Sequence, residues 1–462
     1  MESTVSTLSA RLERLPLSRW HWRVLGVLGL AWAFDGLDST IIGAIAAALG
    51  KEWQLSPGTL GFLISSNLAG TIIGALLASM GDRFGRKTIF QWSLLWFSLL
   101  SLACAFTWNV PSLIFFRFLM GFGLGAELPI VASYMGELVP ASARGRTQGL
   151  LNSFWPIGAI LAALIALLVI PSSDAGWRWA FAIGAVPALL VGISRRMLPE
   201  SPRWLVLQGR QDEARVIVER IEKSVAATTG QPLPPIGTLP DAVSKVSVVQ
   251  GLFRDGGARR TTMLWGLLFF AYIGNAGLFG WMPSLFTNAG FSLNKSFVYV
   301  LIMQVAYVPN QFIGAYLMDR IGRRFVLIAN GLLSAASGVV YGWVLIDHAS
   351  PAVILIMGIV VSFFVSAMFG AIHVYGPEQY PTSVRTTGYG TARIFGNIGA
   401  TLGPIIIGFV LPAFGVFGVF CVISGAFVIA AAFVLVMGTE TKGRTLDNIV
   451  GPPVAAAGPG IP

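Results

Sequence analysis

Gly81-Asp82-Arg83-Phe84-Gly85-Arg86-Lys87 lies between two long apolar runs and decides the fold. One acid and three bases cannot lie in hydrocarbon, so this stretch predicts a tight turn at a membrane surface. The arrangement returns 237 residues later as Asp319-Arg320-Ile321-Gly322-Arg323-Arg324, again between apolar runs.

Other charged stretches repeat at nearly the same distance. Glu137 and Arg144 are followed 241 residues later by Glu378 and Arg385, and the pair of Glu200 and Arg203 is answered by Glu440, Lys442 and Arg444. A series repeated in constant order indicates an internal duplication. A duplicated apolar chain with its charges at helix junctions is typical of a transporter with two halves.

Composition also indicates a membrane protein. The 462 residues are 55% hydrophobic and only 11% charged, and the mean hydropathy is +0.73. Soluble domains carry about a quarter charged residues, so most of this surface does not face water. The net charge of +10 therefore suggests bases gathered on one membrane face rather than a nucleic-acid partner.

Apolar runs long enough to cross a hydrocarbon core of about 30 Å occur twelve times. We place them at 24–49, 58–80, 88–108, 111–136, 147–170, 178–198, 262–287, 297–318, 325–346, 351–376, 384–411 and 414–437. The sequence thus predicts an all-α membrane protein with twelve transmembrane helices in two pseudo-symmetric six-helix halves. The halves are 23–198 and 261–437, and a bend is expected where Trp155 precedes Pro156.

Three polar segments flank these halves. They are a polar N-terminus at 1–22, a linker at 199–260 and a tail at 438–462. The linker holds one amphipathic helical pattern, formed by Trp204, Leu205, Leu207, Val216, Val218 and Ile221. The bases set the orientation: 26 Lys and Arg lie in these segments and the loops on their side, and Lys51, Arg178 and Lys295 are the three on the other side. Both termini and the linker are therefore expected in the cytoplasm.

The motifs resemble those of the major facilitator superfamily over about residues 22–448. The segment 81–87 is similar to its cytoplasmic loop motif, and 117–125 to its fourth-helix motif. Two stretches, 199–205 and 439–444, resemble the signatures of sugar porters, but 272–280 lacks the paired glutamines of that branch. Asp35-Gly36-Leu37-Asp38 resembles a motif of aromatic-acid/proton symporters, and the whole pattern resembles bacterial niacin transporters.

Acids at membrane depth are costly and by default mark a pathway or a partner. Asp35 and Asp38 are three residues apart and share a helix face. Two neighbouring carboxylates favour proton uptake by one of them. The alternative is a carboxylate paired permanently with an arginine.

Arg393 lies about ten residues into the eleventh span. A guanidinium keeps its charge and grips a carboxylate with two hydrogen bonds, so Arg393 is the candidate to bind an anionic substrate. The alternative is a salt bridge to Asp35 or Asp38. In the organic-ion carriers that the chain resembles, the corresponding stretch carries an arginine in anion carriers.

Two further charged residues lie in the fourth span. Arg117 is either an interface residue that reaches water or, by the resemblance, part of proton coupling. Glu127 is a second candidate for a protonatable group.

Polar and aromatic residues at expected midplane depth are the other substrate-binding candidates: Asn152, Trp155, Asn275, Phe279, Gln304, Tyr307, Gln311 and Phe369. Gln304, Tyr307 and Gln311 share one helical face. His373 could titrate near neutral pH, although a lone histidine is weak evidence. Gly70 with Gly74 and Gly399 with Gly403 are spaced for close helix packing.

The charged turns are expected to form a cytoplasmic gate. Its predicted ion pairs are Asp82 with Arg86, Glu137 with Arg144, Glu200 with Arg203, and Glu378 with Arg385, while Asp319 and Arg323 repeat the first pair. Such pairs would hold one conformation closed and break when the cavity opens. Each is worth about 1 kcal/mol or less, so they act together.

No nucleotide-binding loop, metal-ligand spacing or nucleophile–base set is recognised in the sequence, so an enzyme is not expected. The leading hypothesis is proton-coupled uptake of a small aromatic carboxylate, nicotinate first, by alternating access across the inner membrane. Its partners would be an organic anion, protons and the lipid bilayer, with no cofactor, no metal and a monomeric chain. The alternatives are a uniporter or symporter of another organic ion, a benzoate-like acid, a polyol or a sugar, and a receptor that does not transport.

Overall fold

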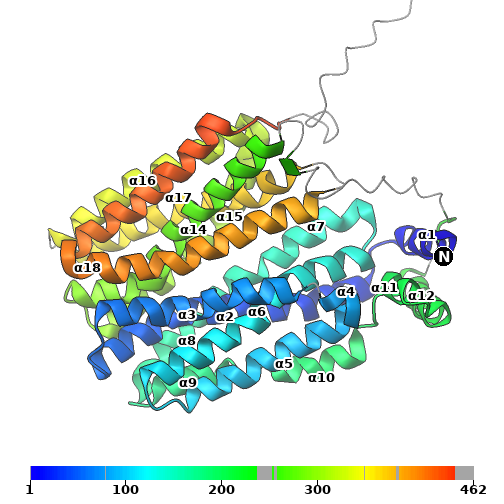
Figure 1. Cartoon of the computed structure of the whole chain (residues 1–462), viewed down its shortest axis with the longest axis horizontal. Helices are drawn as coiled ribbons and strands as arrows, with labels where there is room; N and C mark the ends of the chain where they lie inside the picture. Colours follow the sequence, from blue (N-terminus) through cyan, green and yellow to red (C-terminus); the bar gives the residue numbers. More distant parts are fainter. Residues whose placement is uncertain are drawn as a thin grey trace, which may run out of the picture. The chain divides into compact units, whose positions relative to one another are not determined.

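The computed structural model describes residues 2–78, 80–230, 232–236, 252–253, 257–347, 349–380 and 384–442, and within them the secondary structure is helical throughout (Figure 1). The all-helical prediction is thus confirmed for the described part of the chain. The chain divides into two compact units, Met1–Ala48 with Ser66–Ala242 and Leu49–Ser65 with Val243–Pro462.

Residues 2–229 form α1 (Glu2–Glu13), α2 (Arg19–Glu52), α3 (Pro57–Leu77), α4 (Met80–Phe84), α5 (Arg86–Ala105), α6 (Val110–Leu138), α7 (Ala141–Asn152), α8 (Phe154–Leu168), η1 (Ile170–Ser172), α9 (Gly176–Ile183), α10 (Ala188–Met197), α11 (Pro202–Leu207) and α12 (Gln211–Thr229). In the first unit, α5 packs on α6, α9 and α10.

Residues 257–437 form α14 (Gly257–Asn288), α15 (Leu293–Ile321), α16 (Arg323–Ile346), α17 (Pro351–Glu378) and α18 (Arg385–Met437). In the second unit α18 lies beside α14 and α16, and α17 beside α15 and α16 (Figure 1). Within this unit the first turns of α3 also pack on α18, where the Phe62 and Phe409 rings meet edge to face at 6.2 Å.

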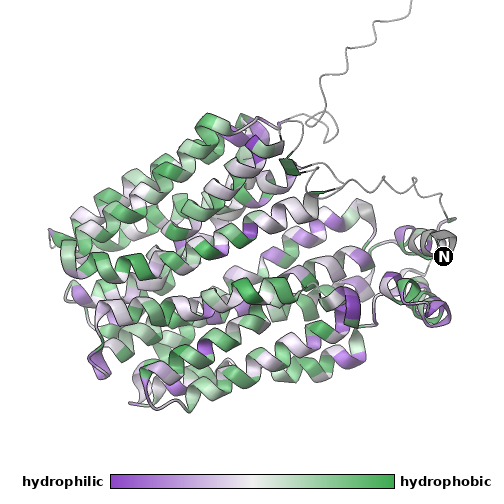
Figure 2. Cartoon of the chain, in the orientation of Figure 1, coloured by the Kyte–Doolittle hydropathy of each residue, from purple (hydrophilic) through white to green (hydrophobic). Residues whose placement is uncertain are grey.

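Ten described helices are long and apolar enough to cross a membrane, judged by length and composition alone. Figure 2 shows apolar residues along the long helices and polar residues on α1 and α12. Large apolar side chains are exposed on several of these helices, such as Leu168 at 69% and Val436 at 68%. Water does not favour such surfaces, whereas lipid covers them without cost.

Nine of the twelve expected spans each fall in one of these ten helices, and the other three lie in α15 and α18. The span at 297–318 lies in α15, a 29-residue helix that is not among the ten. The spans at 384–411 and 414–437 form one element, α18, which contains a non-helical residue at Gly415 (φ 65°, ψ −169°).

Proline breaks two of the expected continuous spans. The span at 147–170 is interrupted at Ser153, and the span at 178–198 is interrupted between Ile183 and Ala188. A proline ring clashes with the carbonyl four residues before it. Four residues before Pro156 and Pro187 are Asn152 and Ile183, where α7 and α9 end.

The prediction of a tight turn over 81–87 is wrong in extent. Most of the stretch is helical, in α4 and the start of α5, and the reversal is confined to Gly85 with φ 95°. Gly322, with φ 102°, does the same between α15 and α16. Only glycine adopts this backbone region at little cost, so one residue suffices to join the helices.

The segments flanking the spans also differ from expectation. The linker pattern forms two helices, α11 and α12, because Gly209 with φ 78° separates them. Leu207 and Val216 of the predicted apolar face are exposed, at 58% and 52%. The N-terminus contains the unexpected helix α1, which packs on α11 and α12 (Figure 1).

The two glycine pairs are packing sites, as preferred from the sequence. A Cβ atom at Gly70 or Gly74 would collide with backbone oxygens of α6. A Cβ atom at Gly399 or Gly403 would collide with backbone oxygens of α14. A residue without a side chain on one helix allows the backbone of the other to approach this closely.

Candidate functional site

A buried charge cluster joins three helices of the first unit. The guanidinium of Arg117 in α6 donates to the Asp38 carboxylate of α2 over 3.4 and 3.5 Å, and Asn67 Nδ2 of α3 donates to Asp38 over 2.6 Å. Arg117 is 0% exposed and Asp38 is 2% exposed. Arg117 therefore does not reach water in this structure, and Asp38 is paired with an arginine, the arrangement that the sequence left as an alternative.

Asp35 has different partners, one helical turn away. Trp155 Nε1 of α8 donates to Asp35 Oδ2 over 3.0 Å. The charge of Asp35 also acts on Glu127 of α6, which is 0% exposed. Both carboxylate oxygens of Glu127 find no hydrogen-bond partner in the described part of the chain. An ionised carboxylate in such a place is very costly, so Glu127 is a candidate to hold a proton.

The second unit holds the candidate anion site. Arg393 of α18 donates to the hydroxyl of Tyr272 in α14 and lies 5.5 Å from the centre of its ring. The ring of Phe369 in α17 meets Tyr272 edge to face at 5.0 Å. One cation thus lies against an aromatic wall built from three helices.

The other substrate-binding candidates are dispersed. Phe279 and Tyr307 meet edge to face at 5.4 Å. Gln304 and Tyr307 are buried, at 5% and 4% exposure, and Asn275 Oδ1 is buried without a partner among the described residues. The expected Gln311 side chain lies outside the described part, and Asn152 is half-buried at the end of α7.

A first junction cluster surrounds Arg86 at the start of α5. Arg86 pairs with Asp82 at 2.8 Å and with Glu137 at 3.2 Å, and its Nη1 donates to the Gly81 carbonyl. Ser201 donates to the other oxygen of Glu137. The Asp82–Arg86 pair forms as expected, while Glu137 pairs with Arg86 instead of Arg144.

Two of the predicted gate pairs are therefore wrong. Arg144 pairs with Glu13 of α1 and donates to the carbonyls of Gly136 and Val139, because it lies beside the free carbonyls at the end of α6. Glu200 does not pair with Arg203. Its Oε1 accepts the backbone N–H groups of Lys87 and Ser201 instead.

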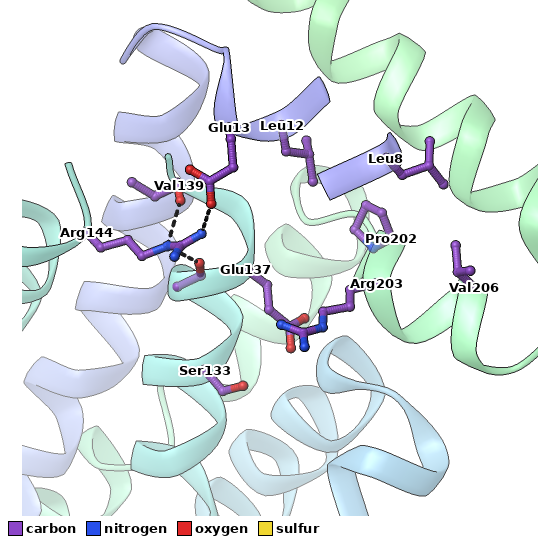
Figure 3. Close-up of a pocket in the computed structure, with 11 residues that line it drawn as sticks. Leu8, Leu12, Glu13, Ser133, Glu137, Val139, Arg144, Pro202, Arg203 and Val206 are labelled. Carbon is purple, nitrogen blue, oxygen red and sulfur yellow. Dashed lines mark hydrogen bonds and ion pairs between the residues drawn. The ribbon is translucent and has the colours of Figure 1, made fainter. Parts of the chain in front are cut away.

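Arg203 points into a cavity that Arg144 also lines (Figure 3). The cavity is about 240 Å³ and lies among α1, the end of α6, α7 and α11. Its walls combine apolar side chains of α1 and α11 with two arginines and two glutamates: Leu8, Leu12, Val206, Arg144, Arg203, Glu13 and Glu137.

The second junction cluster repeats the first in another part of the chain. Arg323 pairs with Asp319 at 2.9 Å and with Glu378 at 3.4 Å. Thr441 donates to Glu378 over 2.6 Å, in the place that Ser201 has in the first cluster. Glu378 thus pairs with Arg323. The predicted pair of Glu378 with Arg385 falls on a side chain outside the described residues.

The acids after the sixth and twelfth expected spans also correspond. Glu440 accepts the backbone N–H groups of Arg323 and Arg324 at the start of α16, as Glu200 accepts that of Lys87 at the start of α5. A Cβ atom at Gly322 or Gly85 would collide with these carboxylates. The duplication read from the sequence is therefore present in the hydrogen bonds.

Several residues of these sites escaped the sequence analysis. Asn67 and Glu13 carry no signal because polar residues at helix faces and ends are common. Tyr272 was noted only within a motif. His373 donates through Nδ1 to the Phe369 carbonyl at 2.8 Å, and its ring lies 6.5 Å from that of Phe369. It therefore belongs to the wall of the Arg393 site.

Comparisons with known proteins agree with this architecture. The model of the family "Sugar (and other) transporter" matches residues 23–450. The niacin transporter NiaP of Acinetobacter baylyi is 37% identical over 96% of this chain and 99% of its own length. The putative niacin/nicotinamide transporter NiaP of Bacillus subtilis is 36% identical over 92% and 98%.

Solved structures show the same fold. The partially occluded inward-open xylose transporter XylE of E. coli aligns with a TM-score of 0.74 and 21% identity, over 93% of this chain and 100% of that chain. The family match over nearly the whole chain, together with these two relatives, establishes the family of the protein. The chain belongs to the sugar (and other) transporter family of the major facilitator superfamily, and is a multi-pass membrane transporter.

Proposed function

We propose that this transporter takes up a small aromatic carboxylate, with nicotinate as the first candidate, together with protons. The observation that carries the proposal is the contact of Arg393 with Tyr272, whose ring in turn meets Phe369, in the second unit. A guanidinium binds a carboxylate with two parallel hydrogen bonds, and aromatic rings pack against a flat ring. The names of the two relatives, one a niacin transporter, support nicotinate.

The charge of the substrate separates this proposal from its neighbours. Nicotinate and nicotinamide have the same ring and differ in one group, an acid or an amide. Aromatic walls hold both rings equally, so discrimination must come from Arg393. The site should bind the acid and reject the amide.

Substitution of Arg393 tests this directly. We expect Arg393→Ala to cost nicotinate about 2 kcal/mol or more of binding free energy, because a desolvated charged hydrogen bond is lost. Arg393→Lys should recover only part, since the planar fork is missing. Equilibrium binding to the purified protein measures both, and Arg215→Ala on the exposed face of α12 is the control. Equal affinity of the wild type for acid and amide would refute the anion site.

Proton coupling is proposed for the acids of the first unit. Glu127 is buried without a partner in the described part, and Asp35 lies near it. Asp38 is held by Arg117 and Asn67. We propose that Glu127 or Asp35 exchanges a proton during the cycle, and that the Arg117–Asp38 pair positions the helices around them.

Alternating access is proposed for the two junction clusters. Each has one arginine that contacts two acids, and a further acid that binds the start of the next helix. Such contacts can stabilise one conformation and break in the other. The proposal includes twelve crossings, both termini in the cytoplasm, the inner membrane, a monomer, and no cofactor beyond the proton gradient. Labelling of Lys51→Cys from outside cells, but not of Arg210→Cys, would test the orientation.

The second candidate is a carrier of another organic ion, a benzoate-like acid, a polyol or a sugar. The family name includes sugars, and one relative is named for nicotinamide as well as niacin. A binding panel of nicotinate, nicotinamide, benzoate, xylose and an organic cation separates these classes.

A further inference from the structure

The ring of His373 in α17 uses its Nδ1 atom in a hydrogen bond with the backbone. Its Nδ1 lies 2.8 Å from the backbone carbonyl of Phe369. A carbonyl oxygen has no hydrogen to donate, so Nδ1 carries the proton in this contact. In the neutral imidazole the other nitrogen, Nε2, then has a free lone pair and acts as an acceptor.

This acceptor is available. Nδ1 makes the one hydrogen bond that His373 forms with the described residues, and the surface of the side chain is half-buried. A polar nitrogen in such a position gains by accepting a hydrogen bond from a bound molecule.

His373 is also the far end of the wall that begins at Arg393. Arg393 lies 5.5 Å from the Tyr272 ring, Tyr272 lies 5.0 Å from Phe369, and Phe369 lies 6.5 Å from the His373 ring. The charge of Arg393 reaches His373 electrostatically. All four residues belong to the second unit and come from α14, α17 and α18. A cation, two aromatic rings and an acceptor thus follow one another.

We propose that His373 Nε2 accepts a hydrogen bond from a donor on the ring of a bound aromatic acid, so that the site binds acids carrying a ring O–H or N–H more tightly than benzoate. The inference rests on the proposed function, since the carboxylate of the same molecule binds Arg393. It adds a second contact, in which His373 recognises a substituent of the ring while Arg393 recognises the carboxylate.

The proposed hydrogen bond predicts an order of affinities among aromatic acids. A benzoate without substituents leaves Nε2 unpaired after its water is removed, which weakens binding. A ring hydroxyl pairs with it and strengthens binding. The unprotonated ring nitrogen of nicotinate is itself an acceptor and cannot pair with Nε2 of neutral His373. Binding of nicotinate therefore depends on Arg393 and the aromatic wall.

The test compares benzoate, 3-hydroxybenzoate and 4-hydroxybenzoate on the purified full-length protein at pH 8, where an ordinary imidazole is neutral. At least one hydroxylated acid should bind the wild type about fivefold more tightly than benzoate, the effect of one neutral hydrogen bond. In His373→Phe this ratio should fall to within about twofold, while the affinity for benzoate itself should stay the same or rise.

His373→Gln is the matched variant, because its amide oxygen is an acceptor of similar reach. It should keep a ratio above twofold, and it decides the matter if the phenylalanine variant fails to fold. Binding of all three acids with equal affinity to the wild type, or a fivefold ratio that persists in His373→Phe, overturns the role of His373 and leaves the proposed function standing. If no aromatic acid binds and the amide or a sugar does, both proposals fall.

Discussion

At the scale of single residues, the buried charges of the first unit fall into two kinds. Asp38 is held by Arg117 and Asn67 with three hydrogen bonds. Removing one member of such a pair leaves an uncompensated buried charge, at a cost of about 3–5 kcal/mol. Glu127 has no partner of this kind in the described residues. A proton on Glu127, as proposed above, could therefore leave and return without breaking an ion pair among the described residues.

Glu127→Gln should separate the two halves of a coupled cycle. We expect the variant to lose accumulation of substrate driven by a pH gradient, because the amide cannot bind or release a proton. Exchange of labelled for unlabelled substrate between loaded vesicles should persist, since exchange needs no net proton movement. Asp174→Asn at an exposed site is the control. Unimpaired gradient-driven uptake by Glu127→Gln would move the coupling role to Asp35.

The sequence identified the charged residues of these sites but not their partners. Asp35, Asp38, Arg117, Glu127 and Arg393 could be predicted because charges are rare and costly in apolar helices. Which charge meets which depends on the rotation and tilt of helices far apart in the sequence. The two wrong ion pairs of the gate have the same cause. They were predicted between residues close in sequence, whereas Glu137 pairs with Arg86 of another helix and Glu200 accepts backbone N–H groups.

At the scale of elements, α1 is fastened to α12 by one buried acid. Arg11 and Arg14 bind Glu222 at 2.6 and 2.7 Å, and Leu8, Leu12 and Leu15 are buried in the apolar cluster that includes α11 and α12. Three charged hydrogen bonds to a side chain that is 11% exposed stabilise more than a surface pair does.

Glu222→Gln should therefore destabilise the protein by about 2 kcal/mol at pH 7. The matched control is Glu219→Gln, whose partner Arg215 is 70% exposed, and there we expect little change. Burial opposes ionisation of Glu222, but the hydrogen bonds from Arg11 and Arg14 leave its pKa below the ordinary value. Its contribution is thus complete above about pH 4.3 and is lost as the pH falls through the folded-state pKa.

Denaturation curves of the wild type and both variants, at pH 7 and at decreasing pH, measure this. The gap between wild type and Glu222→Gln should close on acidification. A gap that stays constant down to pH 3, or an equal loss in Glu219→Gln, would mean that the charge of Glu222 does not fasten α1.

The elements were predictable where one local rule acts alone. Long apolar runs predict the membrane spans. Pro156 and Pro187 predict the helix breaks, because α7 and α9 each end four residues before one of these prolines. The helix α1 was missed because its large apolar residues Leu8 and Leu12 are few in a polar segment. Their helical spacing was the available signal.

At the scale of the whole molecule, the two units contain corresponding charged contacts at their helix junctions. The same contacts occur in both units, with Arg86 and Arg323 each bound to two acids, and Glu200 and Glu440 each bound to the backbone at the start of a helix. The substrate candidates do not follow this repeat: Arg393 and its aromatic wall occur in the second unit, and the buried acids in the first. The two junction clusters thus correspond between the units, whereas the residues proposed for substrate binding and for proton coupling lie in different units.

Uptake of labelled nicotinate by proteoliposomes containing the wild-type protein tests proton-coupled transport of an aromatic carboxylate. We expect accumulation above the outside concentration when the outside is acidic, and loss of that accumulation when the gradient is collapsed. Excess unlabelled benzoate should compete, whereas nicotinamide and xylose should not, because only the acid offers a carboxylate to Arg393. Uptake that ignores the gradient, or competition by xylose or nicotinamide in place of benzoate, would contradict proton-coupled transport of an aromatic carboxylate.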